Sequence, residues 1–145
     1  MTASQAKTPV WYWILAVIGL LWFAMGAFDY AATQLRLDFY MSNFTEEQLA
    51  YFYGFPSWYV ATWAISVWGS FIGAILLLLR MKLASLLFLV SLISFIVGAI
   101  YSFGFTNGVE IMGGFGAVIF SAVIFVSILA YFWLARWASQ RGILK

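Results

Sequence analysis

The sequence predicts an all-α integral membrane protein, a four-helix bundle with both termini in the cytoplasm, and three observations support this. The chain is 66% apolar and 8% charged, with a mean hydropathy of +1.00, whereas about a quarter of the residues in a soluble domain are charged. Four apolar segments of roughly 20 residues are each long enough to cross a hydrocarbon layer of about 30 Å. Finally, the charged residues fall into two groups on opposite sides of these segments.

The charge distribution gives the expected orientation. All five acidic residues belong to one side: Asp29, Asp38, Glu46, Glu47 and Glu110. Six of the seven basic residues belong to the other side, and Arg36 is the exception; the six are Lys7, Arg80, Lys82, Arg136, Arg141 and Lys145. Because Lys and Arg are retained on the cytoplasmic side, we expect the termini and the short turn there. The net charge of +2 then indicates contact with anionic lipid rather than with nucleic acid.

The spans form one membrane domain, 1–145. They are predicted at about 10–32, 57–79, 83–105 and 114–134. Pro9 and Pro56 each precede a span, where a proline is tolerated because the first helical N–H groups have no partner in the helix. In lipid the backbone must satisfy its own hydrogen bonds, so each span is expected to be a helix.

Aromatic residues support the same topology, because Trp and Tyr prefer the two membrane boundaries. The cytoplasmic boundary is expected at Trp11, Tyr12, Trp13, Tyr131, Trp133 and Trp137. The opposite boundary is expected at Tyr30, Tyr51, Tyr53, Trp58, Tyr59 and Tyr101.

The connections between spans differ in length. The short turn Arg80–Lys82 makes the second and third spans antiparallel neighbours. The long connection after the first span contains Thr45 and, three residues later, Gln48, which matches a capping box. Acidic residues follow Thr45, and they suit the positive end of a helix dipole. We therefore predict a short helix over 46–53 at the outer membrane surface, with an irregular aromatic-rich loop as the alternative.

Five residues are candidates for a binding site: Asp29, Tyr30, Arg36, Trp22 and Trp68. An acidic residue in a span is a functional hypothesis by default, but counting about 1.5 Å per residue from Val10 places Asp29 near the outer interface. Asp29 is therefore expected either to pair with Arg36 or cap the interfacial segment, or to contact a ligand or partner. Trp22 and Trp68 lie near mid-depth, where serine hydroxyls are possible partners of the indole N–H.

Small residues form stripes on the second and third spans: Ser66, Gly69, Gly73, Ser94 and Gly98. Small side chains let helices approach closely in lipid. Because the short turn already brings these spans together, packing within the chain is the expected role, and contact with another subunit is the alternative.

The composition argues against catalysis and metal binding. The chain has no His and no Cys, so the commonest general base and metal ligand are missing. The interiors of the spans hold no Asp, Glu, Lys, Arg, His, Asn or Gln, whereas a proton relay or ion-coupled carrier needs an ionisable group at depth. We predict a protein that is not an enzyme and has no metal site, and no cofactor is identified.

Several short motifs in residues 20–80 resemble a known family. The motifs are Gly26-Ala27-Phe28-Asp29-Tyr30, Tyr40-Met41, Phe44-Thr45 with Gln48, Phe55-Pro56 with Trp58, and Leu77-Leu78-Leu79-Arg80. With them the chain resembles small four-span bacterial inner-membrane proteins that are often loosely labelled sugar transporters. The resemblance implies a bacterial inner-membrane location and this topology. Phe23 stands where relatives are expected to have asparagine, which removes a hydrogen-bonding group at mid-span.

These observations favour an accessory or scaffold subunit of a larger membrane complex, since apolar and aromatic helix faces suit packing against other helices and lipids. The expected partners are membrane lipids together with other membrane subunits or a second copy, and no nucleic acid. One alternative is a small carrier for a neutral solute such as a sugar, with a cavity at mid-depth lined by Trp22, Trp68 and the serines. Another is a protein that binds lipid, quinone or pigment.

Overall fold

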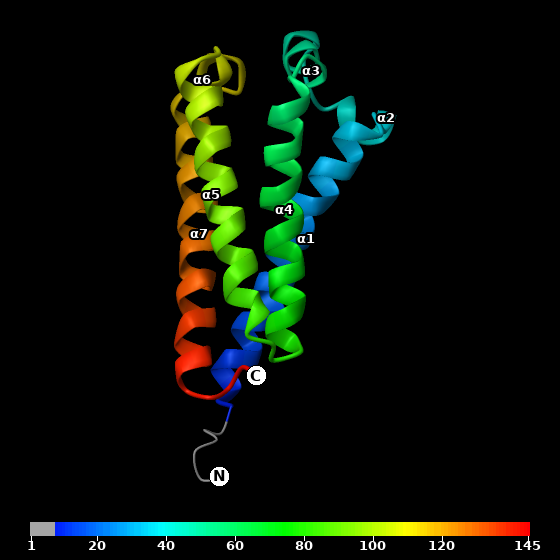
Figure 1. Cartoon of the computed structure of the whole chain (residues 1–145). Coiled ribbons are helices and arrows are strands. Elements are labelled where there is room, and N and C mark those ends of the chain that lie inside the picture. The colour runs from blue at the N-terminus through cyan, green and yellow to red at the C-terminus, as the bar shows by residue number, and fades with distance from the viewer. Residues whose placement is uncertain (1–7) are drawn as a thin grey trace.

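The computed structural model describes residues 8–145, which form seven helices and no strand (Figure 1). The long helices are α1 (Val10–Gln34), α4 (Ser57–Leu78), α5 (Leu83–Gly104) and α7 (Phe115–Gln140). The short ones are α2 (Asp38–Met41), α3 (Glu46–Tyr53) and α6 (Gly108–Ile111). Each long helix is long and apolar enough to cross a membrane. The prediction of an all-α chain with four such helices is confirmed, and this is the pattern of a multi-pass membrane protein. Lys7, used in the charge argument, lies outside the described residues.

The predicted bounds of the first three spans agree with the helices to within two residues. The helix of the fourth span continues beyond the span predicted at about 114–134, because α7 extends past Leu134 to Gln140. The apolar run stops at Arg136, but the helix keeps an apolar stripe on which Ala135 and Ala138 are buried. Trp137 on this extension packs against Trp11 with ring centroids 5.0 Å apart. Contact with α1 therefore extends the helix beyond the segment that hydropathy marks.

The long helices pack in the order α1, α4, α5, α7 (Figure 1). Tyr30 of α1 packs edge-on against Trp63 of α4, with centroids 4.8 Å apart. The turn at Arg80–Lys82 joins α4 and α5 as antiparallel neighbours, as predicted. The ring centroids of Phe95 on α5 and Phe125 on α7 lie 6.4 Å apart.

Helices α1 and α7 meet near the first turns of α1. The Tyr131 hydroxyl donates a hydrogen bond of 2.7 Å to the backbone oxygen of Leu15. Phe23, Phe88 and Tyr131 form a cluster of three rings with centroids 5.4–5.9 Å apart. Beyond this level α1 leans away from α7 (Figure 1). The bundle is therefore closed at one end and opens toward the other.

The closed end, which we call the terminal end, contains Thr8, the turn Arg80–Lys82 and the last residues of the chain. The Lys145 N–H donates to the Arg80 oxygen (2.8 Å), and the Lys82 N–H donates to the Lys145 oxygen (3.0 Å). Ile143 and Leu144 are buried beside this pairing. The last residues therefore form a clasp, Ile143–Lys145, on the α4–α5 turn.

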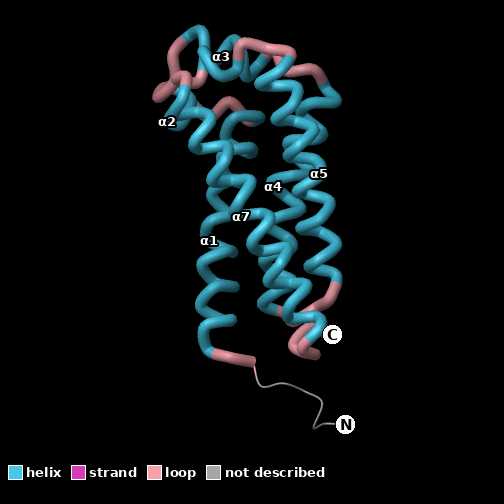
Figure 2. The backbone as a smooth tube through the Cα atoms, turned by 90° about the vertical axis from the view of Figure 1, so that its left-hand side faces the viewer, coloured by secondary structure: helices cyan, strands magenta, loops and turns pink. Residues whose placement is uncertain are grey.

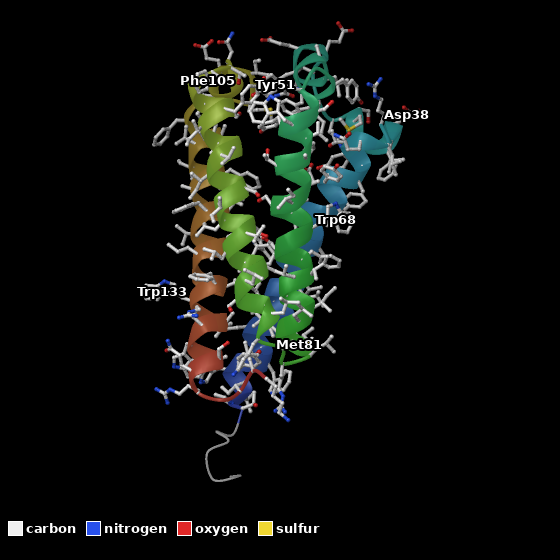
Figure 3. The ribbon with its side chains drawn as sticks, viewed as in Figure 1. Asp38, Tyr51, Trp68, Met81, Phe105 and Trp133 are labelled. Atoms are coloured by element: carbon white, nitrogen blue, oxygen red, sulfur yellow. The ribbon has the colours of Figure 1, made fainter. Side chains whose placement is uncertain are left out.

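The opposite end is covered by α2, α3 and α6, which we call the cap. The predicted helix over Glu46–Tyr53 and its capping box between Thr45 and Gln48 are both confirmed. The Gln48 side chain also donates to the Ile111 oxygen (3.1 Å). The Tyr51 hydroxyl shares hydrogen bonds with Ser102 (2.9 Å) and Thr106 (2.7 Å), and the ring lies between the two halves of the bundle (Figure 3). These contacts hold α3 across the ends of the long helices, and Figure 2 shows α3 lying over those ends.

Candidate functional site at the capped end

Asp29, the acidic residue within α1, accepts a hydrogen bond from a residue that comes later in the chain. Beyond α1 the backbone reverses, and α2 returns so that the Tyr40 hydroxyl donates a hydrogen bond to Asp29 Oδ1. The Thr33 hydroxyl donates to the backbone oxygen of Asp29 at 2.7 Å. The contact of Asp29 is thus a tyrosine hydroxyl, where sequence reasoning favoured Arg36 as its partner.

The Tyr40 hydroxyl is held in its protonated, donating form. Burial raises the pKa of Tyr40 above its ordinary value, and the hydrogen bond to Asp29 and the negative charge of that carboxylate raise the pKa further. Burial disfavours the charged phenolate, and a neighbouring carboxylate disfavours it again. Tyr40 therefore acts as a hydrogen-bond donor to Asp29 at every physiological pH.

Arg36 lies where α1 ends and points to a different tyrosine. Its backbone has a φ of 54°, the left-handed region that costs a residue with a side chain about 1–2 kcal/mol. The bonds Leu37 N–H to Ala32 oxygen (3.0 Å) and Arg36 N–H to Thr33 oxygen (3.2 Å) form a Schellman motif, in which glycine usually holds this position. The Arg36 guanidinium carbon lies 4.0 Å from the centroid of the Tyr53 ring.

A small cavity opens beside this stacked pair. Its volume is about 150 Å³. The lining comes from the end of α1, from α3 and the residues after it, and from the start of α4; it comprises Thr33, Gln34, Arg36, Phe52, Tyr53, Phe55 and Val60. A guanidinium and an amide therefore share a small space with three aromatic rings.

An aromatic strip leads from the cavity along α1 and α4 toward the middle of the bundle. Phe55 lines the cavity, and its ring centroid lies 6.1 Å from that of Trp63. The centroid of Trp63 lies 4.8 Å from that of Tyr30. The centroid of the Tyr30 ring in turn lies 6.5 Å from that of Trp68, and the centroid of Trp68 lies 5.9 Å from that of Phe71. Trp68 is at a level between Tyr51 in the cap and Met81 in the terminal turn (Figure 3).

The five candidate binding residues do not form one site. Tyr30 and Trp68 belong to the aromatic strip, and Arg36 to the cavity. Trp22 lies two turns before Tyr30 on α1 and packs against the buried core. Ser70, one of the serines considered as an indole partner, donates instead to the backbone oxygen of Ser66 at 2.8 Å.

The small residues lie where α4 meets α5. A Cβ added at Gly73 would lie 3.1 Å from the Phe88 ring, and one added at Gly69 would collide with the Ser91 hydroxyl. A Cβ on Gly98 of α5 would contact Tyr59 and Thr62 of α4 at 3.6 and 3.7 Å. Ser66 is buried on α4, and Ser94 is partly buried on α5. The glycines therefore permit close packing within the chain.

A second, larger groove lies between α5 and α7. Its volume is about 500 Å³. Nearly all of its lining is apolar: Phe95, Ile96, Ala99, Ile100, Phe103, Val118, Ser121, Ala122 and Phe125. Neither the lining of this groove nor that of the cavity at the cap includes Trp22, Trp68, Ser66 or Ser94.

The residues that sequence reasoning missed are the tyrosines Tyr40 and Tyr53 and the amide of Gln34. Tyr40 did carry a signal, because it belongs to one of the family motifs quoted above. No sequence signal places Tyr53 under Arg36, since that contact depends on a left-handed turn taken by an arginine.

No protein family, curated protein or solved structure matches the chain. The resemblance to four-span inner-membrane proteins therefore stays a prediction.

Proposed function

We propose that the chain is a non-catalytic, multi-pass protein of the bacterial inner membrane that acts as an accessory or scaffold subunit of a larger membrane complex. The observation that carries this proposal is the weak packing of α7. Of its 26 residues only Ile128, Ala135 and Ala138 are buried, and all three lie in its second half. The first half of α7, together with α5, presents an apolar groove that no other part of residues 8–145 fills.

The shape of this groove suits a transmembrane helix of another protein. Ala99, Ser121 and Ala122 place small side chains in the groove, and Phe95 and Phe125 place large rings there. Small residues allow a second helix backbone to come close, and large neighbours provide contact area, which is what drives helix association in lipid. On α5 the groove extends over Phe95–Phe103, about 12 Å or two helical turns.

The orientation follows from the charges. The basic residues Arg80, Lys82 and Lys145 gather at the terminal end, and the retention of Lys and Arg in the cytoplasm favours that end as the cytoplasmic one. The cap, with α3 at the outer membrane surface, then faces away from the cytoplasm.

Site-specific photo-crosslinking in native membranes tests this proposal. A photoreactive residue at Val118, in the groove, is expected to form an adduct with a distinct membrane polypeptide that mass spectrometry identifies. Adding Ala122→Trp should fill the groove and abolish the adduct. The matched control is a photoreactive residue at Ile18, exposed on α1, which should crosslink to lipid only.

Two results would contradict the proposal. One is an adduct at Val118 that survives Ala122→Trp. The other is a chain that forms no adduct with another protein and purifies in mild detergent as a monomer or a lone homodimer.

The carrier alternative has less support. It calls for a cavity at mid-depth lined by Trp22, Trp68 and the serines, and the two cavities described above lie elsewhere.

A further inference from the structure

We infer that the cavity at the cap binds the head group of a zwitterionic phospholipid, with an acyl chain of that lipid along the aromatic strip. This site lies on α1, α3 and α4, away from the groove between α5 and α7, so it goes beyond the proposed function. It is carried by two features already described: the Arg36–Tyr53 stack at the cavity, and the strip of rings that continues from it.

Arg36 has the chemistry for the phosphate. It is the one basic residue between Thr8 and Leu79, and its guanidinium carbon lies over the Tyr53 ring, 4.0 Å from the ring centroid. Arg36 is exposed and lines the cavity, and the N–H groups of a guanidinium match the geometry of a phosphate. The exposed Gln34 amide adds donors in the same cavity.

The backbone at Arg36 supports a role beyond structure. Glycine would adopt the φ of 54° without strain, yet an arginine occupies the position. Strained residues persist only where the surrounding structure holds them in place, and they cluster at ligand sites and other functional sites. The second arginine with a positive φ, Arg80 (57°), lies at the terminal end and provides a comparison.

The size and position of the cavity favour an amphiphile over a soluble ligand. At about 150 Å³ it is smaller than the 300–1,000 Å³ of ordinary small-molecule sites, which favours a small polar group such as a head group over a whole soluble ligand. The strip of Tyr30, Trp63, Trp68 and Phe71 then covers about 12 Å of α4. Trp68 is 37% exposed, which leaves the strip open to an acyl chain.

The charge at this end selects the kind of head group. Five acidic residues and one basic residue give the capped side a formal charge of −4 (−5 and +1). Such a field disfavours a lipid with a net negative charge. In a zwitterionic lipid the phosphate would contact Arg36, while the negative charge of the capped side would attract the ammonium group.

Native mass spectrometry of the purified chain with added lipids tests the inference. The probes are dioleoyl phosphatidylethanolamine, dioleoyl phosphatidylglycerol and dioleoyl glycerol, together with soluble glycerophosphoethanolamine. The key variant is Arg36→Gly, which removes the side chain and relieves the backbone. Arg80→Gly makes the same change in the same conformation at the other end. Arg36→Lys keeps the charge and loses the planar edge, so an intermediate affinity is expected.

The wild type is expected to bind phosphatidylethanolamine more tightly than the other three probes. Arg36→Gly should lower that affinity about tenfold or more, as for the loss of charge-assisted hydrogen bonds, and Arg80→Gly should leave it unchanged. Trp68→Ala should also weaken binding, whereas Trp133→Ala, on the exposed surface of α7 (Figure 3), should not.

Three outcomes would overturn the inference. Equal affinity of Arg36→Gly and wild type removes the phosphate site. Equal binding of soluble glycerophosphoethanolamine and the lipid makes the site one for a free ligand. Tighter binding of phosphatidylglycerol shows that the head group is anionic rather than zwitterionic.

Discussion

Asp29 and Arg36 each contact a tyrosine that a short cap helix brings back to the end of α1. Tyr40 of α2 donates to Asp29, and Tyr53 of α3 lies under Arg36. The two contacts give the charged residues separate environments. The Asp29 carboxylate gains a donor in a partly buried position, while the guanidinium keeps its N–H groups at the cavity.

Replacing Tyr40 with Phe tests the first contact. The substitution leaves the Asp29 carboxylate without its hydroxyl donor, so we expect the free energy of unfolding to fall by about 1–3 kcal/mol. SDS titration or thermal unfolding in detergent would measure the loss. Asp29→Asn, which keeps an oxygen to accept the hydrogen bond, is expected to cost less; an equal cost would show that the charge matters more than the bond.

The same tyrosine predicts a loss of stability in alkali. Its pKa is raised in the folded state above the ordinary value of 10.0. The stabilisation is therefore fully present below about pH 10 and is lost at higher pH, because the unfolded chain releases the proton first. Unfolding measured from pH 8 to 11 should show the difference between wild type and Tyr40→Phe shrinking above pH 10. A constant difference would refute this.

At the scale of elements, close packing of α4 on α5 depends on glycine. Gly73 faces the Phe88 ring, which is fully buried and would lie 3.1 Å from an added Cβ. We expect Gly73→Leu to lower the free energy of unfolding by about 1–3 kcal/mol through overpacking. Gly116→Ala on α7, where an added Cβ meets nothing within 4 Å, is the control and should be neutral or slightly stabilising. If the two substitutions changed the free energy of unfolding equally, the contact between Gly73 and Phe88 would not be the tight one.

The clasp at the terminal end is the second element with a measurable effect. Leu144 is only 1% exposed, although it lies after the last helix. Leu144→Ala should therefore cost about 2–5 kcal/mol, as in a protein core. Val10→Ala, at a position 74% exposed, should change little. Unfolding midpoints of the two variants measured side by side decide the matter, and similar midpoints would mean that the clasp contributes nothing.

At the scale of the whole molecule, hydropathy predicted the four long helices, because length and apolar character alone decide which segments can cross a bilayer. The capping box predicted α3, since its signal is local. Contacts between segments that are distant in the sequence could not be predicted from local patterns. The extension of α7 depends on Trp11, and the partners of Asp29 and Arg36 depend on the reversal of the chain at a left-handed arginine.

Orientation is the prediction that belongs to the entire chain. The sequence has no cysteine, so single cysteines provide clean reporters. Asn43→Cys, exposed in the cap, should react with a membrane-impermeant maleimide in spheroplasts, whereas Met81→Cys, in the terminal turn, should react only after permeabilisation. Labelling of both positions from the same compartment would refute the prediction that α4 crosses the membrane.

The clasp also has a practical consequence. The backbone N–H and oxygen of Lys145 are both hydrogen-bonded, to Arg80 and Lys82 respectively. A purification tag or fluorescent protein fused to Lys145 would therefore leave the chain at the residue that makes both bonds. Such a fusion would compete with the clasp and report on a loosened form of the protein. A small epitope inserted near the exposed Asn43 leaves the pairing intact and is the better handle.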